Sequence, residues 1–508
     1  MRIVAYGSED RLLTGNPQVT FFKIVFRRYT RFAKDTKEIT SSSGGTYPIP
    51  TSGGDLLKNL FLQIRPANDA AISRGNILTY INTIKFELRS LTYDTLYNDF
   101  NAILMELETP EAKVNGLRNM LNQNYINSST SDNYIYYPLK FWFCKNPGLA
   151  LPLVCLTNSN PTIKLNTAVT TPTYQLYGEF IYLAEDERRR FAQSSHEYLI
   201  EEHQRFTAPL GAGIKKVTIN SFERPIKELY WVVSNGNTET HCNFYPFNAG
   251  ATNFSGSEYI VAAGDDDLKL TIKAAGNTFV DKMDMNYFKT VEPFNYHTRI
   301  PSSTIKSATV SINNITTTQF AEALPIYQFS KTSKVLSVKA TVFDITVGGS
   351  DVSLYLGTVL TSGLLDIAGA SPAATILSSA TQDFNGLGAK TFALHTDEKA
   401  IVAANGYLGL KPSSSLAAGD VIIYIEYEEF PTLIAGNNQH LANLYSYSFA
   451  LRPEESQPSG TLNFSRIDNM IFETESTQFH PDSSTDGVHL KVFAISYNVL
   501  RISPAGIS

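Results

Sequence analysis

The feature that most constrains this chain is a succession of short apolar segments separated by turn signals. Residues 84–88 alternate strictly between apolar and charged side chains, as expected of a half-buried strand. Stretches rich in Gly, Pro and Ser, such as residues 41–55, interrupt these segments. The 30 Phe and 27 Tyr residues suit packing in β-structure. Many short strands with regularly placed turns predict β-sandwiches.

Two segments depart from this strand pattern. Residues 94–108 have apolar side chains at nearly helical spacing. Residues 185–190 place three acids before three arginines, which predicts a short helix because acids are favoured at its N-terminus and bases at its C-terminus. Both segments are short, so the expected fold class remains all-β.

Length and composition bound the class of protein. At roughly 100–200 residues per domain, the 508 residues predict two to four domains. Hydrophobic residues make up 43% and charged residues 18%, which suffices for a sizeable core. The net charge of −6 argues against a protein that coats nucleic acid. No signal peptide or transmembrane helix is expected, because no apolar run of sufficient length occurs.

The chain has three cysteines, Cys144, Cys155 and Cys242. Their low, odd number argues against a disulfide framework and fits folding in a reducing compartment. Cys144 and Cys155 lie in apolar sequence, so buried thiols are expected there.

The composition changes after residue 300. No arginine occurs between Arg299 and Arg452, and residues 302–440 are rich in Ala, Ser, Thr and Gly. Strand patterns nevertheless recur at 338–345 and 421–427, and the segment is too long for a loop. This predicts a separate β-domain inserted into the chain.

Seven stretches match, in order, the sequences of one known family. They include VAYGSEDRLLTGNPQVTFFKIVFRRYTRFA near the start, then YYPLKFWFCKNPGLALPLVCL, and YSFALRPEESQPSGTLNFSRIDN near the end. Their positions are 4–33, 136–156, 180–204, 224–233, 295–301, 447–469 and 492–502. The chain thereby resembles the major capsid proteins of the nucleocytoplasmic large DNA viruses.

The resemblance implies a double jelly roll, that is, two consecutive eight-stranded β-sandwiches, here with a third β-domain inserted in the second. The expected division is an N-terminal arm 1–35, a first jelly roll 36–205, a linker 206–214, a second jelly roll 215–301 and 441–508, and an outward-facing insertion 302–440. A connection between the same two motifs forms part of the outward towers in relatives.

The resemblance also implies an assembly. Three chains form a pseudo-hexagonal capsomer, and capsomers tile an icosahedral shell over an internal membrane. The implied partners are the chain itself in a homotrimer, neighbouring capsomers and minor capsid proteins, with the membrane contacted indirectly and nucleic acid not contacted directly. The implied location is the virion, after assembly in the host cytoplasm. Neither a cofactor nor an enzymatic activity is implied.

Two departures from the family pattern leave an alternative open. Residues 157–161 replace a His-Glu-Val run, and residues 302–446 separate two motifs that follow closely in the family. The chain is expected to be the main shell subunit. The alternative is a minor capsomer paralogue at vertices or a fibre base, whose insertion 302–440 contacts a host surface or glycan.

The N-terminal arm carries the first candidate contact residues. An apolar run, residues 19–26, precedes Arg27, Arg28 and Arg31. One interpretation is a strand or short helix with a solvated basic end. The other is an arm that docks on a neighbouring subunit or an acidic inner partner, through inter-capsomer or inner contacts of these arginines.

Other candidate sites are weak. Asn253 and Asn314 stand in sequons and are candidate glycosylation sites. His196 and His203 match no metal-ligand spacing, and the acidic cluster 265–267 is expected to be a solvated turn rather than a calcium site. No catalytic constellation is found, so no metal, cofactor or catalytic residue is predicted.

Overall fold

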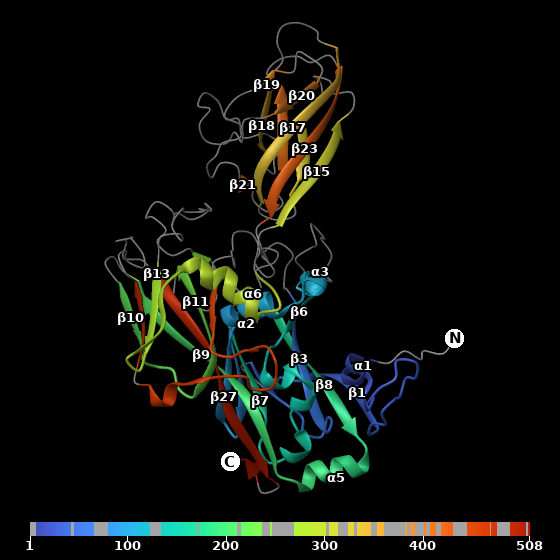
Figure 1. Ribbon diagram of the computed structural model, residues 1–508, viewed down its shortest axis with the longest axis vertical. Helices are drawn as coiled ribbons and strands as arrows, with labels where there is room; N and C mark the ends of the chain where they lie inside the picture. Colours follow the sequence, from blue (N-terminus) through green and yellow to red (C-terminus); the bar gives the residue numbers. More distant parts are fainter. Residues whose placement is uncertain are drawn as a thin grey trace.

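The computed structural model consists mainly of antiparallel sheets arranged as β-sandwiches (Figure 1). The residues that it describes are 7–41, 45–65, 80–121, 134–168, 170, 172–210, 215–235, 244–245, 269–300, 304–312, 324–329, 333–346, 353–359, 382–383, 388–391, 401–402, 407–412, 418–429, 444–467, 469–474, 488–503 and 506–507. Within these ranges the strands form six sheets.

The first sandwich consists of two four-stranded sheets. Its strands are β1 (Phe32–Ile39), β2 (Thr46–Pro48), β3 (Leu56–Arg65), β4 (Ile81–Leu88), β5 (Leu91–Tyr97), β6 (Ile135–Pro138), β7 (Thr162–Thr167) and β8 (Thr173–Leu183). The first strand pairs with the eighth, the second with the seventh, the third with the sixth and the fourth with the fifth. Folding this antiparallel ribbon over itself gives the sheet orders β1-β8-β3-β6 and β2-β7-β4-β5. Ile84, Phe86 and Leu88 all enter the core, as their alternation predicts.

The second sandwich repeats this pairing order. Its strands are β9 (His196–Pro209), β10 (Lys216–Ile219), β11 (Pro225–Asn235), β12 (Phe244–Tyr245), β13 (Lys269–Ala274), β14 (Asn277–Asp284), β24 (Tyr445–Ser448), β25 (Leu462–Asn463), β26 (Met470–Thr474), β27 (Val488–Ser503) and β28 (Gly506–Ile507). β9 pairs with β27, β10 with β26, β11 with β24, and β13 with β14. One sheet is β10-β26-β13-β14, and the other, with seven strands, contains β9, β27, β11 and β24.

The boundary between the sandwiches differs from the expected one. Residues 196–205 were expected to close the first unit and 206–214 to form a linker, but β9 is continuous from His196 to Pro209. It pairs along its whole length with β27, from His196 opposite Ile502 to Pro209 opposite His489. β9 is therefore the first strand of the second sandwich. Residues 211–214 lie outside the described part of the chain.

In the seven-stranded sheet, β11 is buried on both faces. On β11, Leu229, Trp231 and Val233 enter the core of the second sandwich. The intervening Tyr230 and Val232 enter the core that includes the first sandwich. Because successive side chains of a strand point to opposite faces, a strand buried on both sides is apolar on both faces along most of its length. This sheet therefore joins the two sandwiches into one packed body.

The helices are short, and all of those described except α1, which lies on the exposed N-terminal arm, lie beside or between the sheets. They are α1 (Ser8–Thr14), α2 (Asn98–Glu108), α3 (Glu111–Met120), α4 (Trp142–Lys145), α5 (Glu185–Gln193) and α6 (Glu292–Tyr296), with a π-helical turn η6 (Tyr287–Val291) before α6. Short 3₁₀ turns η2 (Pro147–Leu149), η3 (Leu153–Cys155) and η9 (Phe464–Arg466) complete the set. The helix predicted at 185–190 is confirmed as α5. The helical spacing at 94–108 is confirmed from residue 98 onward as α2, whereas residues 94–97 end strand β5. Among the described helices, none has the length and apolar character needed to span a bilayer.

The strands between β14 and β24 form a separate pair of sheets. They are β15 (Thr304–Ile312), β16 (Leu324–Gln328), β17 (Ser333–Thr346), β18 (Ser353–Val359), β19 (Gln382–Asp383), β20 (Gly388–Thr391), β21 (Ile401–Val402), β22 (Tyr407–Pro412) and β23 (Ala418–Glu429). The sheets are β15-β23-β17-β20, with β21 beside β17, and β16-β22-β18-β19. Thr304 lies opposite Glu429, so the first and last described residues of this unit are neighbours. In Figure 1 it projects from the end of the molecule opposite α5.

Candidate functional site

Helix α2 lies between the first sandwich and the seven-stranded sheet. Every residue from Asn98 to Leu107 is buried. Phe100 stacks on Phe493 of β27 at a ring-centroid distance of 4.8 Å and meets the edge of Tyr230 at 5.4 Å. The helix nevertheless carries three acids, Asp99, Glu106 and Glu108. A buried carboxylate is costly unless it is paired, so the chain must supply a cation for each.

Each acid of α2 has a cation from another segment. The Lys491 ammonium lies 3.0 Å from Asp99, with both side chains fully buried. The Arg299 guanidinium donates to Glu106 at 2.7 Å. Glu108 accepts from Lys140 at 3.1 Å and from Lys145 at 3.0 Å. The helix is therefore fixed electrostatically to both sandwiches, because Lys491 belongs to β27 of the second.

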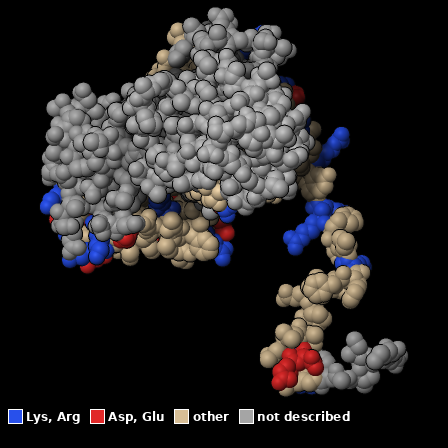
Figure 2. All heavy atoms as spheres, turned by 90° about the horizontal axis from the view of Figure 1, so that it is seen from above, with Lys and Arg blue, Asp and Glu red and all other residues tan. Residues whose placement is uncertain are grey.

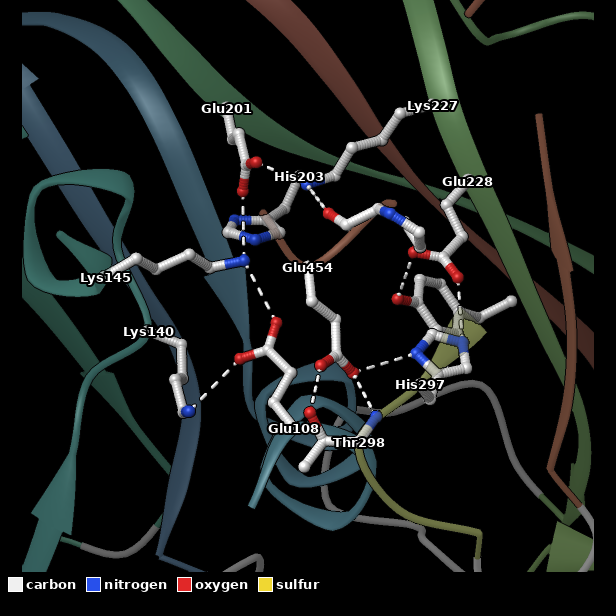
Figure 3. A network of polar contacts seen from close by, with 12 residues as sticks. Glu108, Lys140, Lys145, Glu201, His203, Lys227, Glu228, His297, Thr298 and Glu454 are labelled. Atoms are coloured by element: carbon white, nitrogen blue, oxygen red, sulfur yellow. Dashed lines mark hydrogen bonds and ion pairs between the residues drawn. The ribbon is translucent and has the colours of Figure 1, made fainter. Parts of the chain in front are cut away.

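The pairing at Glu108 continues across the second sandwich (Figure 3). Lys145 also forms an ion pair of 2.9 Å with Glu201 on β9. Glu201 in turn accepts a hydrogen bond from Lys227 on β11. Lys227 donates a second hydrogen bond of 2.7 Å to the carbonyl of Pro453. A chain of alternating charges thus runs from the buried helix to the loop after β24.

A second part of the same region surrounds His297. Its Nε2 lies 2.8 Å from Glu228 of β11, and its Nδ1 lies 3.2 Å from Glu454. Tyr230 donates a hydrogen bond of 2.7 Å to Glu228. The backbone amide of Thr298 donates to Glu454 at 2.9 Å. We call the charged residues of this region the seam network: Glu108, Lys140, Lys145, Glu201, Lys227, Glu228, His297 and Glu454.

The pKa values of the seam network show that its charges are stable. Burial alone would raise the pKa of Glu201, but Lys145 and Lys227 outweigh burial and lower it to about 2. Burial would likewise lower the pKa of His297, but Glu228 and Glu454 raise it to about 10. Glu108 has its pKa lowered by Lys145 and Lys140 against the effect of burial. The seam network contains four acidic and four basic residues, so the numbers of potential negative and positive charges are equal.

This arrangement is suited to fixing geometry rather than to catalysis. Buried ion pairs contribute little net stability relative to apolar packing, but breaking one leaves a buried charge, so they penalise any other arrangement of their segments. In the described parts of the chain, no group of three or more His, Cys, Asp or Glu could hold a metal ion. His203, weighed as a ligand, instead contacts Asp94 at 3.0 Å, and His196 contacts the Phe191 carbonyl at 2.8 Å.

Two of the cysteines are free thiols with partial burial, Cys144 and Cys155. Burial raises the pKa of Cys144 to about 12 and that of Cys155 to about 11. A thiol with a raised pKa is a poor nucleophile at neutral pH. Cys242 lies outside the described residues.

The N-terminal arm extends away from the sandwiches (Figure 2). Residues 17–31 form neither helix nor strand, so the expected strand or short helix at 19–26 is wrong. Phe21, Phe22 and Ile24 are 92%, 97% and 96% exposed. A short apolar run needs a second apolar surface to pack against, and the described residues of a single chain leave these side chains exposed.

The arginines predicted as contact residues lie on this arm. Arg27, Arg28 and Arg31 are exposed and lie in the extended segment before β1. The carbonyl of Arg31 accepts a hydrogen bond of 3.1 Å from Ala184, which fixes the end of the arm beside α5. The structure does not bring these arginines together with the seam network. The sequons at Asn253 and Asn314 and the acidic cluster 265–267 lie outside the described residues.

Comparison with known proteins gives two family matches that adjoin. Residues 20–186 match the model described as "Major capsid protein N-terminus". Residues 187–322 and 431–506 match the model described as "Large eukaryotic DNA virus major capsid protein". The chain belongs to the major capsid proteins of large eukaryotic DNA viruses. The junction of the two matches falls within α5, just before β9, where the second sandwich begins.

Relatives of this capsid protein match along nearly its whole length. The major capsid protein of Pyramimonas orientalis virus is 28% identical over 99% of this chain and 96% of its own. That of Phaeocystis pouchetii virus is 26% identical over 99% and 97%. Among solved structures, a chain of the PBCV-1 virus capsid aligns with a TM-score of 0.55 at 20% identity, covering 96% of this chain and 99% of that one. This last likeness shows a shared fold.

Family membership settles the class of function. The chain is a major capsid protein of an icosahedral large DNA virus, a structural component of the virion and not an enzyme. The predicted function as a major capsid protein is thereby confirmed. Capsid assembly implies that the chain associates with other capsid subunits.

The seam network was not predicted from the sequence, although the sequence contains an indication of it. Most network residues lie in the stretches that carry the family resemblance: Lys140 and Lys145 in 136–156, Glu201 in 180–204, Lys227 and Glu228 in 224–233, His297 in 295–301, and Glu454 in 447–469. Glu108 lies outside these stretches. The available signal was a pair of opposite charges, Lys227 and Glu228, inside an otherwise apolar strand, because charges on a buried strand require partners.

Proposed function

We propose that this capsid protein is a double jelly roll that assembles into homotrimeric capsomers of pseudo-hexagonal outline. The observation that carries the proposal is the repeated strand order. In both sandwiches an antiparallel ribbon of four strand pairs is folded over into two sheets, which is the jelly-roll arrangement. Three chains with two similar sandwiches each supply six similar wedges, which suits hexagonal packing.

Light scattering on the purified protein tests the trimer. The expected mass is about three times the 56.3 kDa of one chain. A protein that stays monomeric at micromolar concentration, and gives no trimeric species when extracted from virions, would contradict the proposal.

The arm is proposed to dock on a neighbouring copy of the chain, between or below capsomers. Residues 11–34 carry six basic and no acidic side chains, while the whole chain carries −6, so the remaining residues carry −12. Exposed apolar side chains favour binding to a partner, because docking removes them from water. The positive charge of residues 11–34 favours an acidic surface on a neighbouring copy of the chain. Arg27, Arg28 and Arg31 are the proposed charged contacts.

Two variants test the arm. Deleting residues 1–20 should leave a folded trimer but impair shell assembly, because residues 7–20, the described part of this segment, are all exposed. Replacing Arg27, Arg28 and Arg31 by Glu should weaken assembly at low salt, whereas the matched triple Lys variant should assemble. A truncated chain that cannot fold would show that the arm belongs to the core. Normal assembly of the triple Glu variant would exclude the proposed contacts.

Residues 302–440 are proposed to form an outward-facing domain available to host surfaces or glycans. Its position at one end of the body and the pairing of Thr304 with Glu429 support this, since insertions are tolerated where the two chain ends lie close together. Excision of residues 305–436 with a short Gly/Ser linker should give trimers that assemble with a shortened tower. Loss of folding, or density for the segment on the membrane-facing side, would overturn it.

The remaining proposals concern the place of assembly, its partners and glycan attachment. Assembly takes place in the host cytoplasm, with minor capsid proteins as partners, with the inner membrane contacted indirectly and without direct contact to nucleic acid. Asn253 and Asn314 are proposed glycan attachment sites. Peptide mass spectrometry of virion protein tests the last point, and unmodified peptides covering both residues would exclude it.

A further inference from the structure

Three consecutive residues lead from α6 toward the inserted domain: His297, Thr298 and Arg299, here called the anchor. His297 contacts Glu228 on β11 at 2.8 Å and Glu454 in the loop after β24 at 3.2 Å. Thr298 donates to Glu454 twice, from its amide at 2.9 Å and from its hydroxyl. The first two anchor residues therefore bind the second sandwich at two places (Figure 3).

Arg299 extends the anchor to the first sandwich. Its guanidinium donates to Glu106 of α2 at 2.7 Å and to Glu111 of α3 at 2.8 Å. Its backbone amide donates to the carbonyl of Leu107 at 2.9 Å. The planar guanidinium fixes direction as well as distance when it binds two carboxylates. Within three residues, the chain is thus fixed to both sandwiches.

The chain that returns from the insertion is held differently. It enters β24, where Tyr445 lies opposite Trp231 of β11 and is fully buried. The loop after β24 that supplies Glu454 is itself joined to the first sandwich, because Asn146 donates to Ser456 at 3.1 Å. Strand pairing fixes the returning chain, and side-chain contacts fix the outgoing one.

We propose that His297, Thr298 and Arg299 are positioning residues that orient the inserted domain relative to both sandwiches. Without these residues, β24 on the returning chain would be the remaining attachment, and the inserted domain could rotate about it. With them, the chain that enters the domain is fixed as well, five residues before Thr304 at the start of β15. Every copy in a shell would then present this domain in one orientation. The biological use of that orientation rests on the proposed outward placement, whereas the anchoring itself does not.

Thr298 and Glu111 offer a test that spares the core, because both side chains are exposed. Thr298→Val removes the hydroxyl donor to Glu454 without changing side-chain size, and Thr298→Ser retains it. Glu111→Gln removes one of the two carboxylates that hold Arg299 and leaves the buried Glu106 paired. The double variant T298V/E111Q is compared with T298S alone and with the unaltered protein, all as full-length assemblies.

Two readouts are measured: hydrogen exchange of the Thr298 and Arg299 amides, and the orientational spread of the inserted domain in particle images. In T298V/E111Q we expect exchange at these amides to rise about tenfold, since hydrogen bonds to charged groups are the stronger ones. We also expect a wider spread of domain orientations. Exchange in β11 and β27 should stay unchanged, and T298S should behave like the unaltered protein.

The outcomes separate the two proposals. Unchanged exchange, or faster exchange with an unchanged spread of orientations, would overturn the positioning role. An equal rise in β11 and β27 would overturn it too, because the effect would then be general destabilisation. If the domain instead lies on the inner face while T298V/E111Q still widens its spread, the outward placement fails and the anchor stands.

Discussion

The two sandwiches share a strand order but differ in one equivalent connection. In the first, the chain from β5 to β6 passes through α2 and α3, and α2 turns inward to become a fully buried helix. In the second, the chain from β14 to β24 passes through α6 and then leaves the body to form the inserted domain. The equivalent connection therefore packs between the two sandwiches in the first half of the chain, and it forms the inserted domain in the second half.

The same connection of a sandwich can therefore serve either internal packing or the addition of a domain. The two connections meet, because Arg299 of the second pairs with Glu106 and Glu111 of the first. The inward helix supplies carboxylates, and the outward connection supplies cations. The two sandwiches are therefore joined by ion pairs at the seam network and at Arg299. Substitutions of these charged residues test whether the two sandwiches unfold as one unit.

The largest expected effect comes from Lys145, which joins Glu108 of the first sandwich to Glu201 of the second. Lys145→Met leaves both carboxylates short of a cation, and we expect it to lower the free energy of unfolding by about 3 kcal/mol. Lys140→Met is the matched control, since Lys140 contacts Glu108 alone, and about 1 kcal/mol is expected. Urea midpoints at equal chain concentration measure both. Equal decreases in the free energy of unfolding for the two variants would show that the ion pair between the two sandwiches adds no stability beyond that of the pair within the first.

A second prediction concerns pH. The pKa of His297 is raised from 6.5 to about 10, so its contribution is complete below pH 6.5 and is lost as the pH rises toward 10. The pKa of Glu201 is lowered from 4.5 to about 2, so its contribution is complete above pH 4.5 and is lost as the pH falls toward 2. The seam should therefore stabilise the protein most between about pH 4.5 and 6.5.

Unfolding midpoints between pH 5.5 and 9 test this expectation. Stability should fall across that range by an amount on the order of a few kcal/mol at most. Glu454→Gln should make the fall smaller, because it removes one of the two carboxylates that hold the charge on His297. A flat profile in the unaltered protein would contradict the assignment of His297 as a paired cation.

Local pattern predicted local structure well and long-range pairing poorly. The alternation at 84–88 and the charges at 185–190 are properties of neighbouring residues, and both predictions are confirmed in β4 and α5. The helical spacing before Glu108 predicted a helix, but not that Asp99 would be buried, because its partner Lys491 lies near the other end of the chain. β9 was assigned to the first unit for the same reason, since its partner β27 begins at Val488.

The smallest predicted effect tests the equivalence of the two halves in a single hairpin. β4 and β5 are joined by Arg89 and Ser90 at φ of 52° and 66°, and β13 and β14 by Ala275 and Gly276 at 51° and 75°. Both are two-residue turns with positive φ throughout, which favour glycine at the second position, yet the first sandwich has Ser there. We expect Ser90→Gly to stabilise by about 0.5–1 kcal/mol, because relief of left-handed strain exceeds the added entropy of the unfolded chain.

The reciprocal change, Gly276→Ser, should destabilise by about 0.5–1 kcal/mol. A Cβ at Gly276 would meet no atom within 4 Å, so this loss would reflect backbone strain alone. Urea midpoints of the two single variants and of the double variant measure the effects, and the two changes should cancel because the turns lie in different sandwiches. Changes of the same sign would show that the turns are not equivalent. A double variant far from the sum would instead show that the seam couples even the outer hairpins, which would extend the rigid unit from the buried helix to the edges of both sandwiches.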